Sequence, residues 1–133
     1  MNYTFKGITA EELSFKLNRV KLPQEKLDIK PQFSREVRRV DANNKIRFIA
    51  LSVEIKSTEE SPKPFDIKVT LVGIFELENE VVSKEEERKF VIEATDILYP
   101  YIRSSVTNLT AQAYITPLNL PVLQERIFPE DRN

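Results

Sequence analysis

Apolar and polar residues alternate along much of the chain up to Leu77, which is the pattern of half-buried β-strands. The pattern predicts strands at Leu13 to Leu17, Leu27 to Val37, Lys45 to Lys56 and Phe65 to Leu77. Pro31 predicts an edge position or a bulge for the second strand, because proline cannot donate to a ladder. Since the links between strands are short, we expect an antiparallel meander.

The period then lengthens to that of a helix. Ser83 and Glu86 fit a capping box at its start. Thr95 is a plausible second N-cap, so we expect the helix to be interrupted there and then to continue to Ala113. Pro100 falls near the first turn of this second part, where its missing N–H costs least. Apolar residues at helical spacing indicate a face that packs on the sheet: Leu98, Ile102, Val106 and Leu109.

The segment after Tyr114 is apolar but fits neither period. Pro117 and Pro121 are expected to hold it extended. Leu123 to Phe128 is predicted to form a short final helix, and the charged residues from Pro129 onward are expected to fray. An irregular segment seldom carries so much apolar surface unless something binds or packs there.

Together these elements predict one α+β domain over residues 1–133. It comprises a four-stranded antiparallel sheet, a long C-terminal helix, a crossover loop and a short final helix. One helix face would cover one sheet face. The opposite sheet face carries further apolar residues. A monomer would expose them to solvent, so we expect a homo-oligomer that covers them. These residues are Ile46, Phe48, Val72 and Ile74.

The composition is that of a globular domain, with 41% apolar and 31% charged residues. The formal net charge is −1, which gives no overall attraction to nucleic acid or to an anionic membrane. The cluster of Arg35, Arg38 and Arg39 lacks interleaved aromatics, which favours a solvated strand or a protein contact. No run approaches a membrane span, and the first residues lack a signal-peptide pattern, so we expect a cytoplasmic location.

The residue types available limit the chemistry. The chain contains no cysteine and no histidine, which excludes disulfides, thiolate nucleophiles, serine–histidine triads and zinc sites built on sulfur or imidazole. The two glycines, Gly7 and Gly73, are too far apart for a phosphate-binding loop. Adjacent carboxylates such as Glu11 and Glu12 point to opposite faces of a strand and make a poor catalytic pair. We therefore expect no catalytic residues, no metal and no cofactor.

Several segments resemble the SecB family of bacterial export chaperones. Ile97 to Tyr101 followed by Arg103 is similar to the family's aromatic-Pro-Tyr-x-Arg helix start. Pro117 to Leu120 is similar to its crossover-loop motif, which ends in Leu-Asn-Leu. Weaker matches lie at Gly73 to Phe75 and at Glu12 to Phe15. Together they cover most of the chain in the family's order.

The resemblance implies an ATP-independent holdase that keeps unfolded polypeptide clients in apolar grooves, for export or as the guard of an aggregation-prone antitoxin. It also implies a homotetramer, built as a dimer of dimers, or a dimer. Leu118 and Leu120 have two alternative roles at this point, as client contacts or as cover for the sheet. The implied groove consists of Tyr114, Ile115, Leu118, Leu120 and Val122, with Tyr101, Phe75 and Phe15 as further contributors.

Family members that serve export present acidic residues on the sheet to the ATPase SecA. Glu12 retains one such acid, whereas Lys16 and Lys68 reverse the charge at two others. A like-charged partner is repelled, so these partner-facing positions count against SecA. The alternative function is an oligomeric adaptor that kept the fold but binds one specific folded protein, without general chaperone activity.

Overall fold

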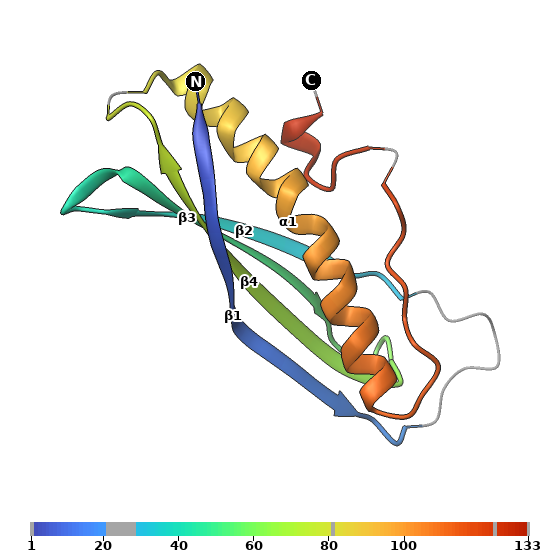
Figure 1. Ribbon diagram of the computed structural model, residues 1–133. Coiled ribbons are helices and arrows are strands. Elements are labelled where there is room, and N and C mark those ends of the chain that lie inside the picture. The colour runs from blue at the N-terminus through green and yellow to red at the C-terminus, as the bar shows by residue number, and fades with distance from the viewer. Residues whose placement is uncertain (1, 21–28, 81, 124, 133) are drawn as a thin grey trace.

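The computed structural model describes residues 2–20, 29–80, 82–123 and 125–132 of the chain. A single long helix lies across one face of a four-stranded sheet, and the segment after the helix returns alongside it (Figure 1). The elements are β1 (Tyr3–Leu17), β2 (Gln32–Val40), β3 (Asn43–Ile55), β4 (Phe65–Leu77), α1 (Lys84–Gln112) and the short 3₁₀ helix η1 (Pro129–Asp131).

The strand order is β1-β4-β3-β2, and every neighbouring pair is antiparallel. The predicted four-stranded antiparallel sheet with a long helix is confirmed. The meander, however, runs only through β2, β3 and β4, because β1 pairs with β4 and not with β2. Residues 18–31 between β1 and β2 make a connection far longer than a tight hairpin, which permits this crossing. Both β1 and β2 are edge strands, in agreement with the position of Pro31 just before β2.

Strand β1 begins at Tyr3, well before the predicted start at Leu13. Its register against β4 shifts twice, between Phe5 and Gly7 and between Ala10 and Glu12. Each bulge adds a residue and breaks the strict alternation, so the first half of the strand does not show a period of two. Strand β2 was predicted to include Leu27, which lies outside the described residues.

Helix α1 is continuous over 29 residues and does not falter at Thr95. The Thr95 hydroxyl donates to the Val91 carbonyl at 2.7 Å, so it bonds back into the helix and does not cap a new one. Pro100 lies inside the helix, and Ser83 is the N-cap as predicted, accepting from the Glu86 amide at 3.1 Å. Although α1 is long, no helix in the described ranges is apolar enough to span a bilayer.

Two expectations for the C-terminus are wrong. The described residues between Leu123 and Phe128 are not helical, and the only turn of helix there is η1, which begins at Pro129. The end is not frayed either, because Asp131 is 3% exposed and forms an ion pair with Arg35 at 2.6 Å. A buried ion pair between segments this far apart in sequence leaves no local pattern.

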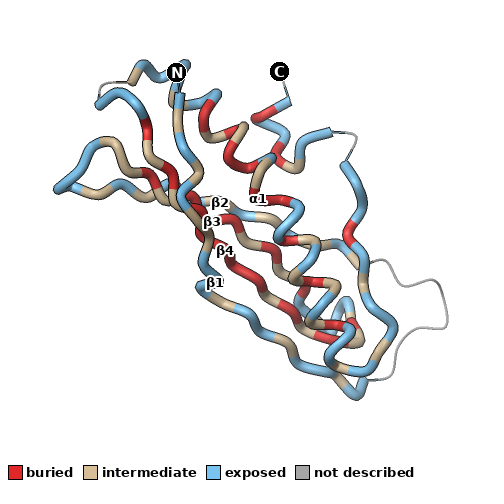
Figure 2. The backbone as a smooth tube through the Cα atoms, in the orientation of Figure 1, coloured by how far each residue is buried: buried red, intermediate tan, exposed pale blue. Residues whose placement is uncertain are grey.

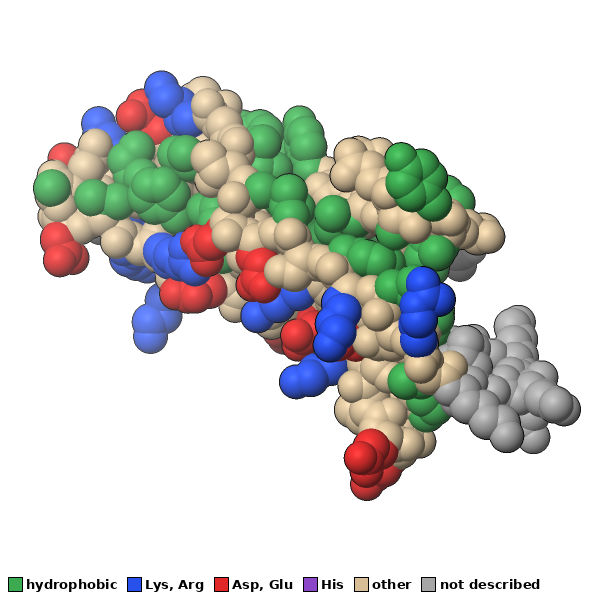
Figure 3. Space-filling model, turned by 90° about the horizontal axis from the view of Figure 1, so that it is seen from below, with side chains coloured by type: hydrophobic (Ala, Val, Ile, Leu, Met, Phe, Trp, Pro, Cys, Tyr) green, Lys and Arg blue, Asp and Glu red, His purple; other side chains and the backbone are tan. Residues whose placement is uncertain are grey.

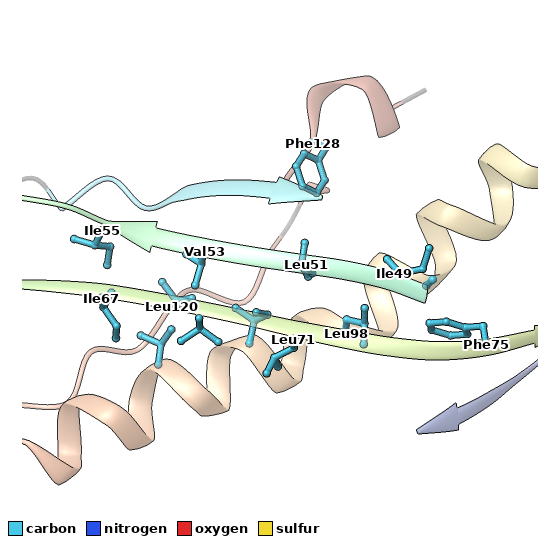
Figure 4. Packing of buried hydrophobic residues seen from close by; sticks show 14 of the residues in the cluster. Ile49, Leu51, Val53, Ile55, Ile67, Leu71, Phe75, Leu98, Leu120 and Phe128 are labelled. Carbon is cyan, nitrogen blue, oxygen red and sulfur yellow. The ribbon is translucent and has the colours of Figure 1, made fainter. Parts of the chain in front are cut away.

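The core lies on one side of the sheet. Figure 2 shows the buried positions concentrated on β3, β4 and α1, with β1 mostly intermediate or exposed. Side chains of β3 and β4 interdigitate with the helix (Figure 4). Burial of apolar area at about 25 cal/mol per Å² makes this layer the main source of stability. On the helix side its members are Phe90, Ala94, Leu98, Ile102 and Val106.

No element of the described chain covers the opposite sheet face, which we call the open face. Ala50 and Val72 are nevertheless only 4% and 5% exposed there. Arg38 of β2 donates two hydrogen bonds to Glu11 of β1, at 2.6 and 2.9 Å. Because β3 and β4 lie between these edge strands, the ion pair arches over the middle of the open face. The arch lowers the pKa of the Glu11 carboxyl, and it reduces the apolar patch predicted for this face.

Gly73 permits the close approach of α1 to β4. A Cβ atom there would lie 2.8 Å from Leu98 Cδ2 and 2.8 Å from Phe75 Cε2, and both side chains are fully buried. We expect Gly73→Ala to lower the free energy of unfolding by about 1–3 kcal/mol through overpacking. Gly7→Ala is the matched control, because no atom lies within 4 Å of its added Cβ. Urea denaturation that found equal effects at both positions would contradict this packing.

Candidate functional site

Helix α1 packs mainly on β3 and β4 and touches β1 sparsely, so it leaves a flank on each side. The β1 flank comprises the core-side apolar residues of β1 and the exposed face of Tyr101. The other flank is covered by the segment that follows the helix, the described residues 114–123 and 125–132, which we call the strap. These two regions hold most of the exposed large apolar side chains of the described chain.

The β1 flank is apolar and open to solvent. Leu13 pairs with Val69 and Leu17 pairs with Phe65, so both leucines project on the core side of the sheet. They are still 52% and 39% exposed, because the helix touches the edge strand only sparsely. Phe15 lies between them, half-buried. Seen from below, hydrophobic side chains run across the molecule, and most of the acidic and basic side chains beside them lie along one side (Figure 3).

Tyr101 forms the helix side of this flank. Its side chain is 46% exposed, and its ring meets the Phe5 ring edge to face at 6.3 Å. Phe5 in turn stacks on the fully buried Phe75 at 5.1 Å. At this end the flank therefore has buried aromatic rings beneath an exposed one, which suits a site for apolar side chains.

The strap is held to α1 by its backbone. Helix residues three or four apart share one face, and here that face carries four polar side chains. Burial raises the pKa of the Tyr99 phenol, which keeps it protonated as a donor. The contacts are Tyr99 Oη to the Pro121 carbonyl at 2.9 Å, Arg103 Nε to the Leu120 carbonyl at 2.9 Å, Thr107 Oγ1 to the Leu118 carbonyl at 3.0 Å, and the Leu118 amide to Thr110 Oγ1 at 2.8 Å.

Side chains of the strap divide between core and solvent. Leu120 is 4% exposed and belongs to the core cluster (Figure 4), while Leu118 and Ile115 pack partly against it. Tyr114 and Val122 are 97% and 76% exposed. Leu120 therefore covers the sheet, and the two exposed residues are free to meet another molecule.

The predicted groove residues do not form one groove. Tyr101 and Phe15 lie on the β1 flank, whereas the strap residues lie across the helix from them. Phe75 is 0% exposed and, like Leu120, is closed to a client in this arrangement. The alternation pattern of β1 places Leu13 and Leu17 on the same side as Phe15, and this pattern is the signal in the sequence that points to them.

The far end of the strap is fixed by a buried ion pair, which we call the latch. Arg35 of β2 donates to both Asp131 oxygens, at 2.6 and 3.2 Å, and to Thr95 Oγ1 at 3.0 Å. Its guanidinium also lies over the Phe128 ring, 4.4 Å from the centroid. The Arg35 and Asp131 side chains are 14% and 4% exposed. The latch joins β2, α1 and η1, so it positions the strap from the sheet side.

The three partner-facing positions lie together on the open face. Lys68 Nζ is 3.8 Å from Glu12 Oε1, and the Ser14 hydroxyl donates to the other Glu12 oxygen at 2.8 Å. Lys16 pairs in register with Asp66, and all five residues border a depression of about 220 Å³. The retained acid is therefore partly neutralised by the reversed charge beside it. Among the described residues, no three acidic side chains are grouped to hold a metal ion.

Comparison with known proteins places these features in context. The family model described as preprotein translocase subunit SecB matches residues 5–129. An uncharacterized protein of Methanocaldococcus jannaschii is 30% identical over 88% of this chain and 76% of its own length. The protein-export protein SecB of Anaplasma phagocytophilum is 30% identical over 56% of this chain, and the match spans 49% of that protein.

One solved structure has a similar fold over nearly the whole chain. It is a SecB-like chaperone of Mycobacterium tuberculosis in complex with a peptide from the HigA1 antitoxin. The TM-score is 0.75, with 20% sequence identity over 94% of this chain and 93% of that one. At this identity the likeness shows a shared fold.

Tyr114 adopts a left-handed backbone conformation, with φ of 61°. Such a conformation costs a non-glycine residue about 1–2 kcal/mol, and the exposed ring gains no packing in return. We expect Tyr114→Gly to raise the free energy of unfolding by about 0.5–1 kcal/mol, since glycine removes the strain but loses more backbone entropy. Tyr114→Ala keeps the strain and is the control. If chemical denaturation showed equal stability for both variants, the strain would not be the cause.

Asp66 ties together the ends of three strands. It accepts from the Ser57 amide at 2.8 Å and from Asn18 Nδ2 at 3.0 Å, and these bonds lower its pKa. A lowered pKa stabilises the fold above the unfolded-state pKa of about 4, and this contribution is lost as the pH falls through the folded-state value. Asp66→Asn should therefore cost about 1 kcal/mol at pH 7 and progressively less below pH 4. A difference from wild type that does not shrink in acid, measured by urea unfolding, would refute this role.

Proposed function

This chain belongs to the SecB family, and on that basis we propose that it is an ATP-independent holdase that binds unfolded or aggregation-prone polypeptides. The observation that carries the proposal is the β1 flank. Leu13 and Leu17 project on the core side of the sheet yet remain exposed, and Tyr101 is exposed on the helix side of the same flank, nearer to Phe5. Apolar side chains on the core side of an edge strand are normally covered, so their exposure marks a contact surface.

The flank has the right chemistry for an unfolded chain. Such a chain offers apolar side chains, whose burial gains about 25 cal/mol per Å². Ordering the client opposes this gain, so one flank alone binds weakly. A homo-oligomer, either a dimer or a tetramer, would present several flanks to one long client and raise the overall affinity through effective concentration. We place this activity in the cytoplasm.

The nature of the client follows from the same surface. The Mycobacterium tuberculosis SecB-like chaperone, which shares this fold, was solved with an antitoxin peptide, and this supports an extended polypeptide segment as the ligand. Tyr114 and Val122, exposed on the strap, would add apolar contacts for such a segment. Both proposed roles, export and protection of an antitoxin, use this contact.

The open face does not favour SecA as a partner. Lys68 neutralises Glu12 at 3.8 Å, and Lys16 adds a second positive charge in the same area. The Arg38–Glu11 arch also crosses this face. A partner that requires a flat acidic sheet would meet mixed charge and a raised ion pair, which lowers its association rate.

A second candidate function is an adaptor that binds one folded protein through the open face. The reversed charges at Lys16 and Lys68 favour it. Pull-down with folded and with urea-denatured proteins separates the two functions. One stoichiometric folded partner, together with no retention of denatured chains, would support the adaptor over the holdase.

The direct test of the holdase is suppression of aggregation. A slowly refolding protein diluted from denaturant should scatter less light when the chain is present at a severalfold molar excess, without ATP. The suppression arises because exposed client side chains are buried on the flanks. Unchanged light scattering at this excess would refute the proposal.

Leu13→Asp combined with Leu17→Asp should weaken client binding about tenfold or more, because two apolar contacts each worth about 1 kcal/mol become charged. Both positions are exposed, so the fold should persist. Ser14→Asp is the control, because it adds an acid to the same strand on the open face. Fluorescence anisotropy with a labelled unfolded protein measures the effect. Equal affinities for the double variant and the control would exclude the β1 flank as the site.

A further inference from the structure

At residues 118–121 the strap is bound to α1 mainly through its backbone, and Asn119 adds one side-chain contact by accepting from Thr107 Oγ1 at 3.0 Å. Three helix side chains, Tyr99, Arg103 and Thr107, donate to strap carbonyls, and Thr110 accepts from a strap amide. Every one of these bonds uses a backbone group of the strap. Any extended polypeptide segment carries the same groups, so the helix face is a general site for extended backbone.

The side chains that accompany this backbone also follow a simple pattern. Leu118 and Leu120 point toward the core cluster, and Asn119 between them is exposed. Such alternation is that of an extended strand with one apolar face. The site therefore accepts an apolar residue at two positions that are two residues apart.

The strap is attached mainly at its two ends and at this site. Tyr114, with φ of 61°, turns the chain at the helix end. The latch, in which Arg35 binds Asp131, holds the other end. Directly after this site, Val122 and Leu123 are exposed and lie outside the core cluster, which the strap rejoins at Ile127 and Phe128. Release of residues 118–121 would thus not require the rest of the fold to open.

We propose that strap residues 118–121 are an internal stand-in for client, and that an extended client segment with apolar residues two positions apart displaces them from α1. The inference rests on the proposed holdase function and adds a second, normally occupied site to the β1 flank. The exchange replaces one set of backbone hydrogen bonds and one pair of apolar side chains with another, so its net cost is small. The strap then competes with the client. The apparent association constant of the client for this site is the intrinsic constant multiplied by the fraction of molecules in which the strap is released.

A reversible lock tests the proposal. Thr107 Oγ1 lies 3.0 Å from Asn119 Oδ1, so these side chains face each other; Thr107→Cys with Asn119→Cys puts a thiol on each, and the chain has no other cysteine, so loss of free thiol on oxidation verifies the bridge. The oxidised form should bind a labelled unfolded protein about tenfold more weakly than the same protein after reduction. Equal or tighter binding by the oxidised form would overturn the proposal.

The control for oxidation is a disulfide that involves neither the strap nor α1. Thr58→Cys with Ser61→Cys bridges the exposed β3–β4 loop, where the Ser61 amide donates to Thr58 Oγ1 at 3.0 Å. Its oxidised and reduced forms should bind client equally. If neither reduced protein binds unfolded client, the proposed function itself fails; if both reduced proteins bind and the strap lock has no effect, the displacement alone fails.

Hydrogen exchange gives an independent readout without substitutions in the site. The Leu118 amide is protected by Thr110 Oγ1, and saturating client should change its exchange rate. Opening the latch with Asp131→Asn should tighten client binding severalfold, whereas Glu130→Gln, whose exposed side chain is outside the latch, should leave it unchanged. Unaltered exchange at Leu118 together with unaltered affinity of Asp131→Asn would also overturn the displacement.

Discussion

A single helix is too narrow to cover a four-stranded sheet, and the rest of this structure follows from that constraint. A helix with its side chains is about 10–12 Å wide, whereas the outer strands of such a sheet are about 15 Å apart. Here α1 lies over β3 and β4, which form the buried layer, and leaves a flank on each side. On the β2 side the strap covers the flank. On the β1 side Leu13 and Leu17 stay exposed.

The two flanks that α1 leaves uncovered differ in how their backbone groups and apolar side chains are satisfied. The strap is irregular, so its backbone groups need partners that no ladder supplies, and α1 provides them through four polar side chains on one face. Edge strand β1 has its backbone paired with β4 on one side only, and its two bulges twist it away from regular pairing. One flank is thus closed by the chain itself, and the other remains available to a second polypeptide.

The sequence predicted the elements with strong periodicity and missed those that depend on distant residues. Strands β3 and β4 and the N-cap Ser83 were found, because their patterns are local. The start of β1 was missed because bulges disrupt its alternation. Phe75 belongs to a motif that suggested groove lining, but its position on a central strand buries it.

The two ion pairs that shape the surface, the arch and the latch, could not be predicted from the sequence either, because each joins residues that are distant in sequence. The arch joins Arg38 to Glu11, and the latch joins Arg35 to Asp131, across separations of 27 and 96 residues. Each depends on strand order, which places β1 and β2 at opposite edges and brings the C-terminus to β2. The resemblance to the SecB family identified the strap as important, and the structure separates its buried part, around Leu120, from the exposed Tyr114 and Val122.

The most direct measurement for the central claim is a methyl NMR titration of the intact chain with an unfolded polypeptide that does not aggregate. We expect shifts at Leu13 and Leu17, on the β1 flank, and none at Val72 and Ile74, on the open face. Shifts confined to the open-face methyls, or no shifts at saturating polypeptide, would contradict binding of clients at the flanks of α1.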